Sequence, residues 1–546
     1  MIDSGNSALY RPRFTPDMLV RALDFDLDRA VIRLADGAAI SAAAFRDATS
    51  RYCQALQALS LPAGSRLAIL SRNRPEVLYF TAACLLNQYV MVPLHPIGSL
   101  DDHLYVVEDA EILALVFDGD CFAARATDIQ ARAPRIRHLL SLGGTGASSA
   151  NAAGDDLNRL AARHMPAPLT APELTAETVY RLTYSGGTTG RPKAIVNTHR
   201  MALALLTIQL AEWEWPGEIR QLVCAPLSHA GAAMFLPTLL RGGSLILLPG
   251  FDPLEVLGAI ERHRITCVLL VPTMIYALLD HPRLDEFDLS SLETVFYGAS
   301  SMSAARLAEA IKRFGPIFFQ FYGQSEAPIS LTLLRKEDHR IDDPRRLASC
   351  GRPTPWVQVA LLDDRNCQVP LGAPGEICAR GPLVMGGYHD RPELTAEVLA
   401  GGWLHTGDVA IEDDEGFLRI VDRKKDLIVT GGFNVYPREI EDVLGAHPLV
   451  ANCAVVGVPD PRWGEAVKAI VVLRSGAAPC AAELIALVRE KKGSVQAPKT
   501  VEFVDAIPVT ALGKPDKKAL RARYAPPASR DAQTQSAQTQ SARSVT

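Results

Sequence analysis

The sequence predicts an α/β protein: a large N-terminal domain of parallel and mixed sheets with covering helices, a β-rich subdomain, and a small α+β C-terminal domain. Two observations carry most of this prediction. Short apolar runs alternate with helical patterns over most of the chain, which is typical of parallel sheets covered by helices. Nearer the C-terminal end, a charged segment separates two strand-like runs, which indicates a domain boundary. The length of 546 residues allows about three to four domain-sized units.

The first third of the chain shows the alternation clearly. Pro75 begins a helix whose apolar residues recur at helical spacing between two strand-like runs. The predicted strands here are Arg66–Ser71, Tyr89–Leu94 and Leu113–Asp118. Residues Ser141–Glu173 are rich in Gly, Ala, Ser and Pro, so we expect a surface loop there.

The alternation resumes after this loop, and each apolar run is followed by Gly, Pro or Ser. The predicted strands are Val179–Tyr184, Ser244–Leu248, Thr266–Val271, Thr294–Tyr297 and Ile317–Phe321. In open parallel sheets, ligands bind at the loops that follow the carboxyl ends of the strands. We therefore expect the functional residues in these loops.

A different architecture is indicated between Pro353 and Ile420, where turns at residues 363–364, 372–375 and 413–416 favour antiparallel strands. The charged segment Val421–Asp426 follows, and the chain beyond it reads as a small mixed α/β domain. From Pro526 onward the sequence is of low complexity, so disorder is expected. We predict an N-terminal domain over residues 1–421, a connection over 422–426, a C-terminal domain over 427–525 and a tail over 526–546.

The charge balance excludes a protein that coats nucleic acid. Lys+Arg is 56 and Asp+Glu is 61, for a net charge of −5, whereas coating nucleic acid needs broad phosphate neutralisation. The ten cysteines are scattered without a C-x-x-C pair, which argues against a zinc ribbon and favours reduced thiols in a cytoplasmic enzyme. The N-terminus has no signal-peptide pattern, and no apolar stretch reaches the ~20 residues of a membrane span.

The most informative run is YSGGTTGRPK at Tyr184–Lys193, which follows a predicted strand. Its glycines let backbone amides approach an anion closely, its hydroxyls add donors and its lysine adds a positive charge. Such a pattern points to a polyphosphate site, although no register fits the Walker A sequence. The residues concerned are Ser185, Gly186, Gly187, Thr188, Thr189, Gly190 and Lys193.

This run resembles the phosphate loop of the adenylate-forming (AMP-binding) enzyme superfamily, which includes acyl-CoA synthetases, luciferases and peptide-synthetase adenylation domains. The usual form is Ser/Thr-Ser-Gly-Thr-Thr-Gly-x-Pro-Lys-Gly. This chain departs from it at Gly186 and Ala194, and because the backbone donors are kept we expect a modest loss of phosphate affinity. Further family motifs follow in order, and the resemblance covers about residues 10–525.

The resemblance implies a nucleotide site built from several loops. A turn after one predicted strand would lie along the adenine, and an aromatic residue after the next strand would stack on it. The serine and glutamate that follow would bind phosphate and Mg²⁺. A later aspartate and arginine would bind the ribose hydroxyls. In chain order these residues are Gly298, Ala299, Ser300, Tyr322, Gly323, Ser325, Glu326, Asp408 and Arg423.

The resemblance also implies the catalytic residues. His229, in Ala225-Pro226-Leu227-Ser228-His229, would border the acyl site. Lys514 would reach the carboxylate and the α-phosphate in the first half-reaction, in which the phosphates are held by Lys193 and the metal by Glu326. Together these charges would screen the repulsion between two anions and stabilise the transition state.

A conformational change is implied for the second half-reaction. Lys425 occupies the family's hinge position, so the small C-terminal domain is expected to be mobile and to rotate about it. Rotation would remove Lys514 and bring in the loop at Gly431 and Gly432, past which the pantetheine arm would reach the acyl group.

The activity implied is that of the acyl-CoA ligase branch, with ATP, Mg²⁺ and coenzyme A as cofactors. No carrier-protein module follows Lys514, which favours a free thiol such as coenzyme A. The segments that would form the acid pocket contain small, apolar and aromatic residues and no cation or Asp to pair with a second polar group. We therefore expect a hydrophobic carboxylic acid, which could be fatty, aryl or alicyclic.

Three alternatives stay open at this point. The chain could be a fatty-acyl-AMP ligase that loads a separate carrier protein, or a non-catalytic nucleotide-binding protein. A hydrolase is disfavoured, because the chain has no G-x-S-x-G nucleophile elbow. Nucleic-acid partners and a transmembrane segment are not expected, while a homodimer is left open.

Overall fold

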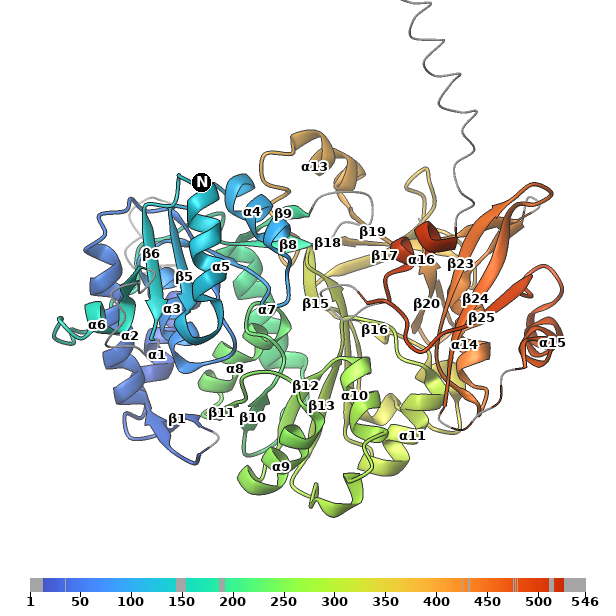
Figure 1. The fold of residues 1–546 in the computed structure, drawn as a ribbon, viewed down its shortest axis with the longest axis horizontal. Helices are drawn as coiled ribbons and strands as arrows, with labels where there is room; N and C mark the ends of the chain where they lie inside the picture. The colour runs from blue at the N-terminus through green and yellow to red at the C-terminus, as the bar shows by residue number, and fades with distance from the viewer. Residues whose placement is uncertain are drawn as a thin grey trace, which may run out of the picture. The chain divides into compact units, whose positions relative to one another are not determined.

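The computed structural model describes residues 13–34, 36–143, 154–185, 192–424, 426–430, 433–474, 476, 478, 480–509 and 515–524 (Figure 1). The chain divides into two compact units, residues 1–420 and 421–546. The predicted fold class is confirmed, because the first unit holds two large sheets with covering helices and a β-rich sheet, and the second is a small α+β unit. Among the described helices, none has both the length and the apolar character needed to cross a membrane.

One sheet of the described chain has seven strands in the order β7-β6-β5-β3-β4-β8-β9. Its neighbouring strands are parallel except β8 and β9, which pair antiparallel on either side of the predicted phosphate loop. The strands predicted in this part of the sequence are all present. Their bounds are β3 (Arg66–Leu70), β4 (Val90–Pro93), β5 (Ala114–Asp118), β6 (His138–Leu142), β7 (Asp155–Asp156), β8 (Val179–Ser185) and β9 (Lys193–Thr198).

A second sheet has nine described strands in the order β16-β15-β14-β13-β12-β10-β11-β1-β2. The strands from β14 to β1 are parallel, and β15, β16 and β2 are antiparallel to their neighbours. His229 therefore follows the carboxyl end of the parallel strand β10, and Ala299 and Ser300 follow that of the parallel strand β13. The bounds are β1 (Ala30–Arg33), β2 (Ala39–Ser41), β10 (Arg220–Val223), β11 (Ser244–Leu247), β12 (Cys267–Leu270), β13 (Thr294–Gly298), β14 (Phe318–Gln324), β15 (Ala327–Leu334) and β16 (Arg352–Pro353).

Many of the helices begin at residues that favour a helix N-terminus. Proline in the first turn, where no helical N–H donor is lost, begins α3, α9, α10 and α13. Ser41 and Ser99 cap α2 and α4 by accepting hydrogen bonds from backbone N–H groups. The helices of this unit are α1 (Thr15–Asp24), α2 (Ala42–Gln57), α3 (Pro75–Leu86), α4 (Leu100–Asp109), α5 (Gly119–Arg132), α6 (Leu157–Ala161), α7 (His199–Glu212), α8 (Phe235–Leu240), α9 (Pro253–His263), α10 (Pro272–Leu279), α11 (Ala304–Phe314), α12 (Pro344–Leu347) and α13 (Pro392–Val398).

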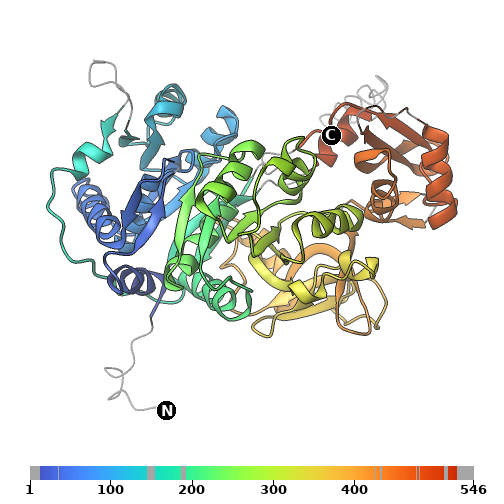
Figure 2. The same cartoon turned by 90° about the horizontal axis from the view of Figure 1, so that it is seen from below.

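The helices bury apolar residues on both sheets. Helices α9, α10 and α11 share one core with strands β10 to β13 and cover a face of the nine-stranded sheet (Figure 2). Helices α1, α2, α3 and α8 share another core with β3 of one sheet and β11 of the other. The second core therefore connects the two large sheets, which carry different parts of the predicted nucleotide site.

The predicted surface loop at Ser141–Glu173 is only partly correct. Ser141 belongs to the end of β6, and Asp155–Ala161 forms the short strand β7 and the helix α6. Asp156 caps α6, while Leu157 and Ala161 are buried. Two buried residues in a stretch of small and polar residues give no clear helical period, so this helix could not be predicted from the sequence.

The predicted antiparallel region forms a sheet in the order β17-β18-β19-β20. Its strands are β17 (Gln358–Leu362), β18 (Gly375–Arg380), β19 (Leu404–Glu412) and β20 (Leu418–Arg423). Strand β20 continues into the charged segment that we expected to lie between strands, because Val421 and Asp422 are buried. The exact domain bounds and the hinge at 422–426 stay predictions.

The second unit has the mixed composition that the sequence predicted. Its described strands follow the order β22-β21-β24-β23, and β25 pairs with β24. These strands are β21 (Ile428–Thr430), β22 (Phe433–Val435), β23 (Val450–Asp460), β24 (Gly464–Leu473) and β25 (Thr500–Phe503). Helices α14 (Pro437–Gly445) and α15 (Ala481–Lys492) share a core with this sheet, and α16 (Lys517–Tyr524) contributes Leu520 to a second, smaller core.

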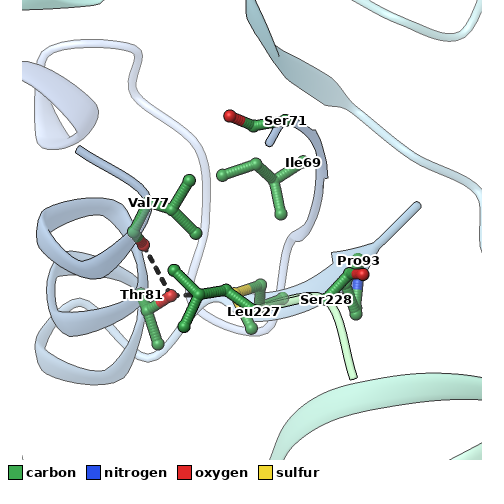
Figure 3. Close-up of a pocket in the computed structure, with 8 residues that line it drawn as sticks. Ile69, Ser71, Val77, Thr81, Pro93, Leu227 and Ser228 are labelled. Carbon is green, nitrogen blue, oxygen red and sulfur yellow. Dashed lines mark hydrogen bonds between the residues drawn. The ribbon is translucent and has the colours of Figure 1, made fainter. Parts of the chain in front are cut away.

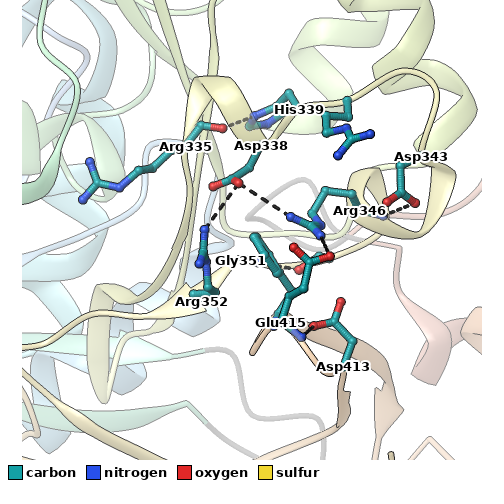
Figure 4. A network of polar contacts seen from close by, with 12 residues as sticks. Arg335, Asp338, His339, Asp343, Arg346, Gly351, Arg352, Asp413 and Glu415 are labelled. Carbon is teal, nitrogen blue, oxygen red and sulfur yellow. Dashed lines mark hydrogen bonds and ion pairs between the residues drawn. The ribbon is translucent and has the colours of Figure 1, made fainter.

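A polar network around the buried side chains of Arg346 and Asp338 joins the nine-stranded sheet to the β-rich sheet (Figure 4). The Arg346 guanidinium lies 3.6 Å from the ring centre of Phe417 and is only 6% exposed. It pairs with Asp338 at 3.7 Å and with Glu415. Arg352 lies over the same ring at 4.3 Å and 3.5 Å from Asp338. Because Glu415 and Phe417 lie in the turn after β19, the network holds that strand in place.

We predict that Arg346→Ala lowers the free energy of unfolding by about 2–3 kcal/mol, because it leaves a buried carboxylate and an aromatic face with only the half-exposed Arg352 as their cation. Urea unfolding followed by tryptophan fluorescence measures this. The matched control is Arg340→Ala, which removes a surface ion pair with Asp342 and should leave the free energy of unfolding close to the wild-type value. Equal effects of the two variants would contradict the assignment.

Candidate active site

The carboxylate of Asp408 is the best-defined polar group among the predicted site residues. It lies on β19, is 4% exposed, and its Oδ2 accepts hydrogen bonds from the Tyr322 hydroxyl at 2.7 Å and from Gln324 Nε2 at 2.8 Å. Gln324 Nε2 also lies 2.7 Å from the carbonyl oxygen of Thr406. The predicted adenine-stacking residue and the predicted ribose-binding residue are thus brought into contact from opposite sheets.

The turn that carries Asp408 is supported by Glu376 on β18. Glu376 Oε1 accepts the Gly407 backbone N–H at 2.8 Å, and its Oε2 lies 3.1 Å from His405 Nδ1. The Thr406 hydroxyl donates to the carbonyl oxygen of Ile377 at 2.6 Å. Each residue from His405 to Gly407 is therefore hydrogen-bonded to β18, which fixes the direction of Asp408.

The predicted adenine turn is built on two close backbone approaches. A Cβ atom at Gly298 would lie 2.2 Å from the carbonyl oxygen of Phe321, and one at Gly323 would lie 2.4 Å from the backbone nitrogen of Ile329. Glycine is therefore required at both positions. Ala299 has a φ of +65°, a strained conformation for a residue with a side chain, and such strain is concentrated at functional sites.

The predicted phosphate-binding lysine and metal-binding glutamate meet at Tyr388. The Tyr388 hydroxyl donates to Glu326 Oε1 at 2.8 Å, and Lys193 Nζ lies 5.4 Å from the centre of the Tyr388 ring. Ser185, at the end of β8, pairs with Lys193 across the hairpin. The Glu326 carboxylate is a hard oxygen ligand in a partly exposed position, which fits a divalent cation that keeps most of its water.

His229 lies in a half-buried position after β10. Its ring contacts His95 edge-to-face at 4.6 Å between centroids, and its Nδ1 lies 3.0 Å from Ser228 Oγ. Burial, then His95 and Arg181, lower the pKa of His229 to about 3, and burial lowers the pKa of His95 to about 4. Arg181 donates to the Ser228 carbonyl oxygen at 2.5 Å. Both imidazoles are neutral at physiological pH.

Aromatic side chains pack behind the His229 loop. Trp213 stacks on Phe321 at 5.3 Å between centroids, with an interplanar angle of 11°, and contacts Phe296 and Phe319. A small cavity lies beside Ser228, with a volume of about 10 Å³, lined by Ile69, Ser71, Val77, Thr81, Met91, Pro93, Leu227 and Ser228 (Figure 3). This cavity has room for about one water molecule and is too small for an acyl group.

Several predicted residues lie outside the described part of the chain. They are Gly186, Gly187, Thr188, Thr189, Gly190, Lys425, Gly431, Gly432 and Lys514. Arg423 ends β20 in the second unit, while Ser300 and Ser325 are partly exposed in the first. Their predicted roles stay predictions.

Sequence reasoning missed four residues that the structure brings to the site: Tyr388, Gln324, Glu376 and His95. Gln324 was inside a motif but at its variable position, and His95 follows a predicted strand, which is a usable signal. Tyr388 follows a Gly-Gly pair in a region assigned only to antiparallel strands. Nothing in the local pattern links it to Glu326.

Two family models of known proteins match most of this chain. Residues 21–389 match the AMP-binding enzyme family, and residues 439–514 match the AMP-binding enzyme C-terminal domain. The chain belongs to the AMP-binding enzyme family. This confirms the resemblance inferred from the YSGGTTGRPK motif and the motifs that follow it.

Relatives within the AMP-binding family are similar over nearly the whole chain. The medium/long-chain-fatty-acid–CoA ligase FadD8 of Mycobacterium tuberculosis is 50% identical over 96% of this chain and 92% of its own. A feruloyl-CoA synthase of Amycolatopsis sp is 38% identical over 89% of this chain and 94% of its own. The solved structure of the amide bond synthetase McbA from Marinactinospora thermotolerans superposes with a TM-score of 0.85 at 35% identity, covering 94% of this chain and all (100%) of that one.

The depressed histidine pKa values predict acid sensitivity. The unfolded chain binds protons at His95 and His229 below about pH 6.5, whereas the folded chain takes them up only near pH 4 and 3. The contribution of the two neutral histidines to the free energy of unfolding is therefore fully present above pH 6.5. It is lost as the pH decreases, by about 1 kcal/mol per histidine at pH 5.5. His95→Gln should reduce the drop in melting temperature between pH 7.5 and 5.5. His281→Gln, in an exposed turn, is the control and should leave the drop unchanged; an unchanged drop for His95→Gln too would refute the assignment.

Proposed function

We propose that this chain is an ATP-dependent acid–thiol ligase that activates a hydrophobic carboxylic acid as an acyl-adenylate and transfers it to coenzyme A, with release of pyrophosphate and AMP. The observation that carries the proposal is the convergence of distant motifs on one nucleotide-sized region. Asp408 contacts Tyr322, and Lys193 and Glu326 flank Tyr388. A non-catalytic nucleotide-binding protein would not need the lysine and the metal-binding carboxylate in addition to the ribose and adenine contacts.

In the proposed first half-reaction, the acid attacks the α-phosphate of ATP and pyrophosphate leaves. Asp408 accepts hydrogen bonds from the ribose hydroxyls, and Tyr322 provides the face against which the adenine lies. Lys193 and the phosphate loop hold the β- and γ-phosphates as they depart. Glu326 would hold Mg²⁺, whose positive charge would stabilise the phosphate oxygens. Lys514 adds a second positive charge at the point where the two anions meet.

In the proposed second half-reaction, the C-terminal domain (427–525) rotates about Lys425 against the N-terminal domain (1–421). Lys514 leaves the site, and the loop at Gly431 and Gly432 replaces it so that the thiol can reach the adenylate carbonyl. A neutral His229 suits a position beside the acyl group, because an imidazolium would cost more to bury next to a hydrophobic acid.

The acid is proposed to be fatty, aryl or alicyclic. The aromatic packing of Trp213 with Phe296, Phe319 and Phe321 behind His229 supplies apolar surroundings. Relatives that act on a fatty acid and on an aryl acid, FadD8 and the feruloyl-CoA synthase, support the same class. Loading of a separate carrier protein is the alternative acceptor reaction. A cytoplasmic location and a homodimer stay predictions.

A pyrophosphate-release assay over fatty, aryl and steroid-derived acids tests this function. We expect ATP- and Mg²⁺-dependent release with hydrophobic acids and not with amino acids, followed by acyl-CoA formation when coenzyme A is added. Acyl-CoA detected by mass spectrometry separates this function from carrier-protein loading. Pyrophosphate release with no acyl-CoA would favour the carrier-protein reaction, and no release with any acid would favour a non-catalytic protein.

We predict that Lys514→Ala lowers the rate of adenylate formation by at least about 100-fold, because it removes the charge that stabilises the first transition state. The same variant should convert a supplied acyl-adenylate and coenzyme A to acyl-CoA at close to the wild-type rate. Rapid-quench measurement of each half-reaction checks this. The neighbouring Lys518→Ala is the control, and a parallel loss in both half-reactions would contradict the role of Lys514.

A further inference from the structure

The segment 385–389, between β18 and α13, connects two motifs of the proposed nucleotide site. On one side it pairs with β9, the strand that begins at Lys193. The Val196 N–H donates to the Gly387 carbonyl oxygen at 2.9 Å, Gly386 donates back to Val196 at 3.0 Å, and His389 donates to Ala194 at 2.9 Å. On the other side, the Met385 N–H donates to the Glu326 carbonyl oxygen at 2.8 Å. The segment is therefore held rigidly between both motifs.

Two glycines allow this close pairing. A Cβ atom at Gly386 would lie 3.3 Å from side-chain atoms of Thr198 and Val196, and Gly387 has a φ of +125° with Thr395 2.8 Å from its Cβ position. The next residue, Tyr388, forms a bridge with Ile195, and its backbone N–H donates to the Thr395 hydroxyl oxygen at 2.9 Å. The backbone of Tyr388 is thus fixed independently of its side chain.

The Tyr388 side chain lies between two opposite charges. It is 9% exposed, its hydroxyl donates to Glu326 Oε1 at 2.8 Å, and Lys193 Nζ lies 5.4 Å from the ring centre. Lys193 and Glu326 both lie in the described chain, yet the structure shows no ion pair between them. Burial and then the Glu326 carboxylate raise the pKa of Tyr388, so the hydroxyl stays protonated and remains a donor.

The separation matters because opposite charges at a few ångströms attract strongly where water is partly excluded. A direct Lys193–Glu326 pair would occupy the lysine that has to meet phosphate and the carboxylate that has to meet a divalent cation. The ring offers each group a weaker partner instead: a π-face for the ammonium and one hydroxyl for the carboxylate. Either group can leave such a partner at small cost when its ligand arrives.

We propose that Tyr388 is a positioning residue that keeps Lys193 and Glu326 apart and oriented, so that the nucleotide site binds phosphate and a divalent cation at the same time. The role rests on the proposed function, since it needs Mg²⁺–ATP as ligand. It assigns a specific task to a side chain that lies in none of the motifs from which the site was predicted.

Isothermal titration calorimetry of the full-length protein with ATP tests the role, once with Mg²⁺ and once with EDTA. Tyr388→Leu removes the ring and should raise the Kd for ATP about tenfold in EDTA, because Lys193 is then held by Glu326. Adding Glu326→Gln to Tyr388→Leu should restore ATP affinity in EDTA to near the wild-type value. The single variant Glu326→Gln should leave ATP affinity in EDTA within about twofold of wild type and abolish the gain from Mg²⁺.

Tyr388→Phe separates the two contacts and guards against misfolding of the leucine variant. It keeps the ring, so ATP affinity in EDTA should stay unchanged. Because one hydrogen bond to Glu326 is lost, the Mg²⁺ concentration that gives half of the Mg²⁺-dependent gain in ATP affinity should rise roughly threefold. Tyr89→Phe, which alters a buried hydroxyl in the N-terminal core, is the control and should behave as wild type.

The proposal would be overturned if Tyr388→Leu bound ATP in EDTA as tightly as the wild type. An unchanged Mg²⁺ requirement in Tyr388→Phe would also overturn it. Failure of the Glu326→Gln substitution to rescue a folded Tyr388→Leu variant would do so as well. These results are distinct from failure of the proposed function, in which the wild-type protein itself would bind no ATP under either condition.

Discussion

The hydrogen bonds that Tyr322 and Gln324 donate to Asp408 join the nine-stranded sheet to the β-rich sheet at the centre of the candidate site. A carboxylate that is 4% exposed is stable only when it is well hydrogen-bonded. The strand that carries this carboxylate is also held at both ends: the turn before Asp408 is hydrogen-bonded to Glu376, and the far end of β19 is held by the Arg346 network. One buried aspartate is therefore hydrogen-bonded to residues of both sheets.

The remaining charges of the site are arranged so that they do not cancel one another. Lys193 and Glu326 are separated by an aromatic ring, and the histidines near the acyl side are kept neutral by burial. A nucleotide and its cation need fixed positive and negative groups close together, while an acyl chain needs an uncharged surface. In the proposed site, the first set lies at the β9 hairpin and the β14 end, and the apolar aromatic residues behind the loop after β10 would face the acyl chain.

Much of this arrangement could be predicted from residue pattern. Buried parallel strands are continuous apolar runs, so β3, β5, β12 and β13 were found from sequence alone. Segments with little buried area were harder to predict from the sequence. Helix α6 was missed because only Leu157 and Ala161 are buried. The motifs located Tyr322, Glu326 and Asp408, but their mutual contacts could not be read from spacing, since 86 residues separate Tyr322 from Asp408.

The sequence by itself determined the fold class, the order of the strands along the chain and the types of residue proposed to face the nucleotide, because apolar periodicity and glycine-rich loops are local properties. Only the tertiary structure decided which groups meet. Tyr388 contacts Glu326 and Lys193, His95 contacts His229, and Glu376 holds the turn of Asp408. Such contacts depend on sheet order and on backbone approaches of a few ångströms, which arise only when segments distant along the chain pack together.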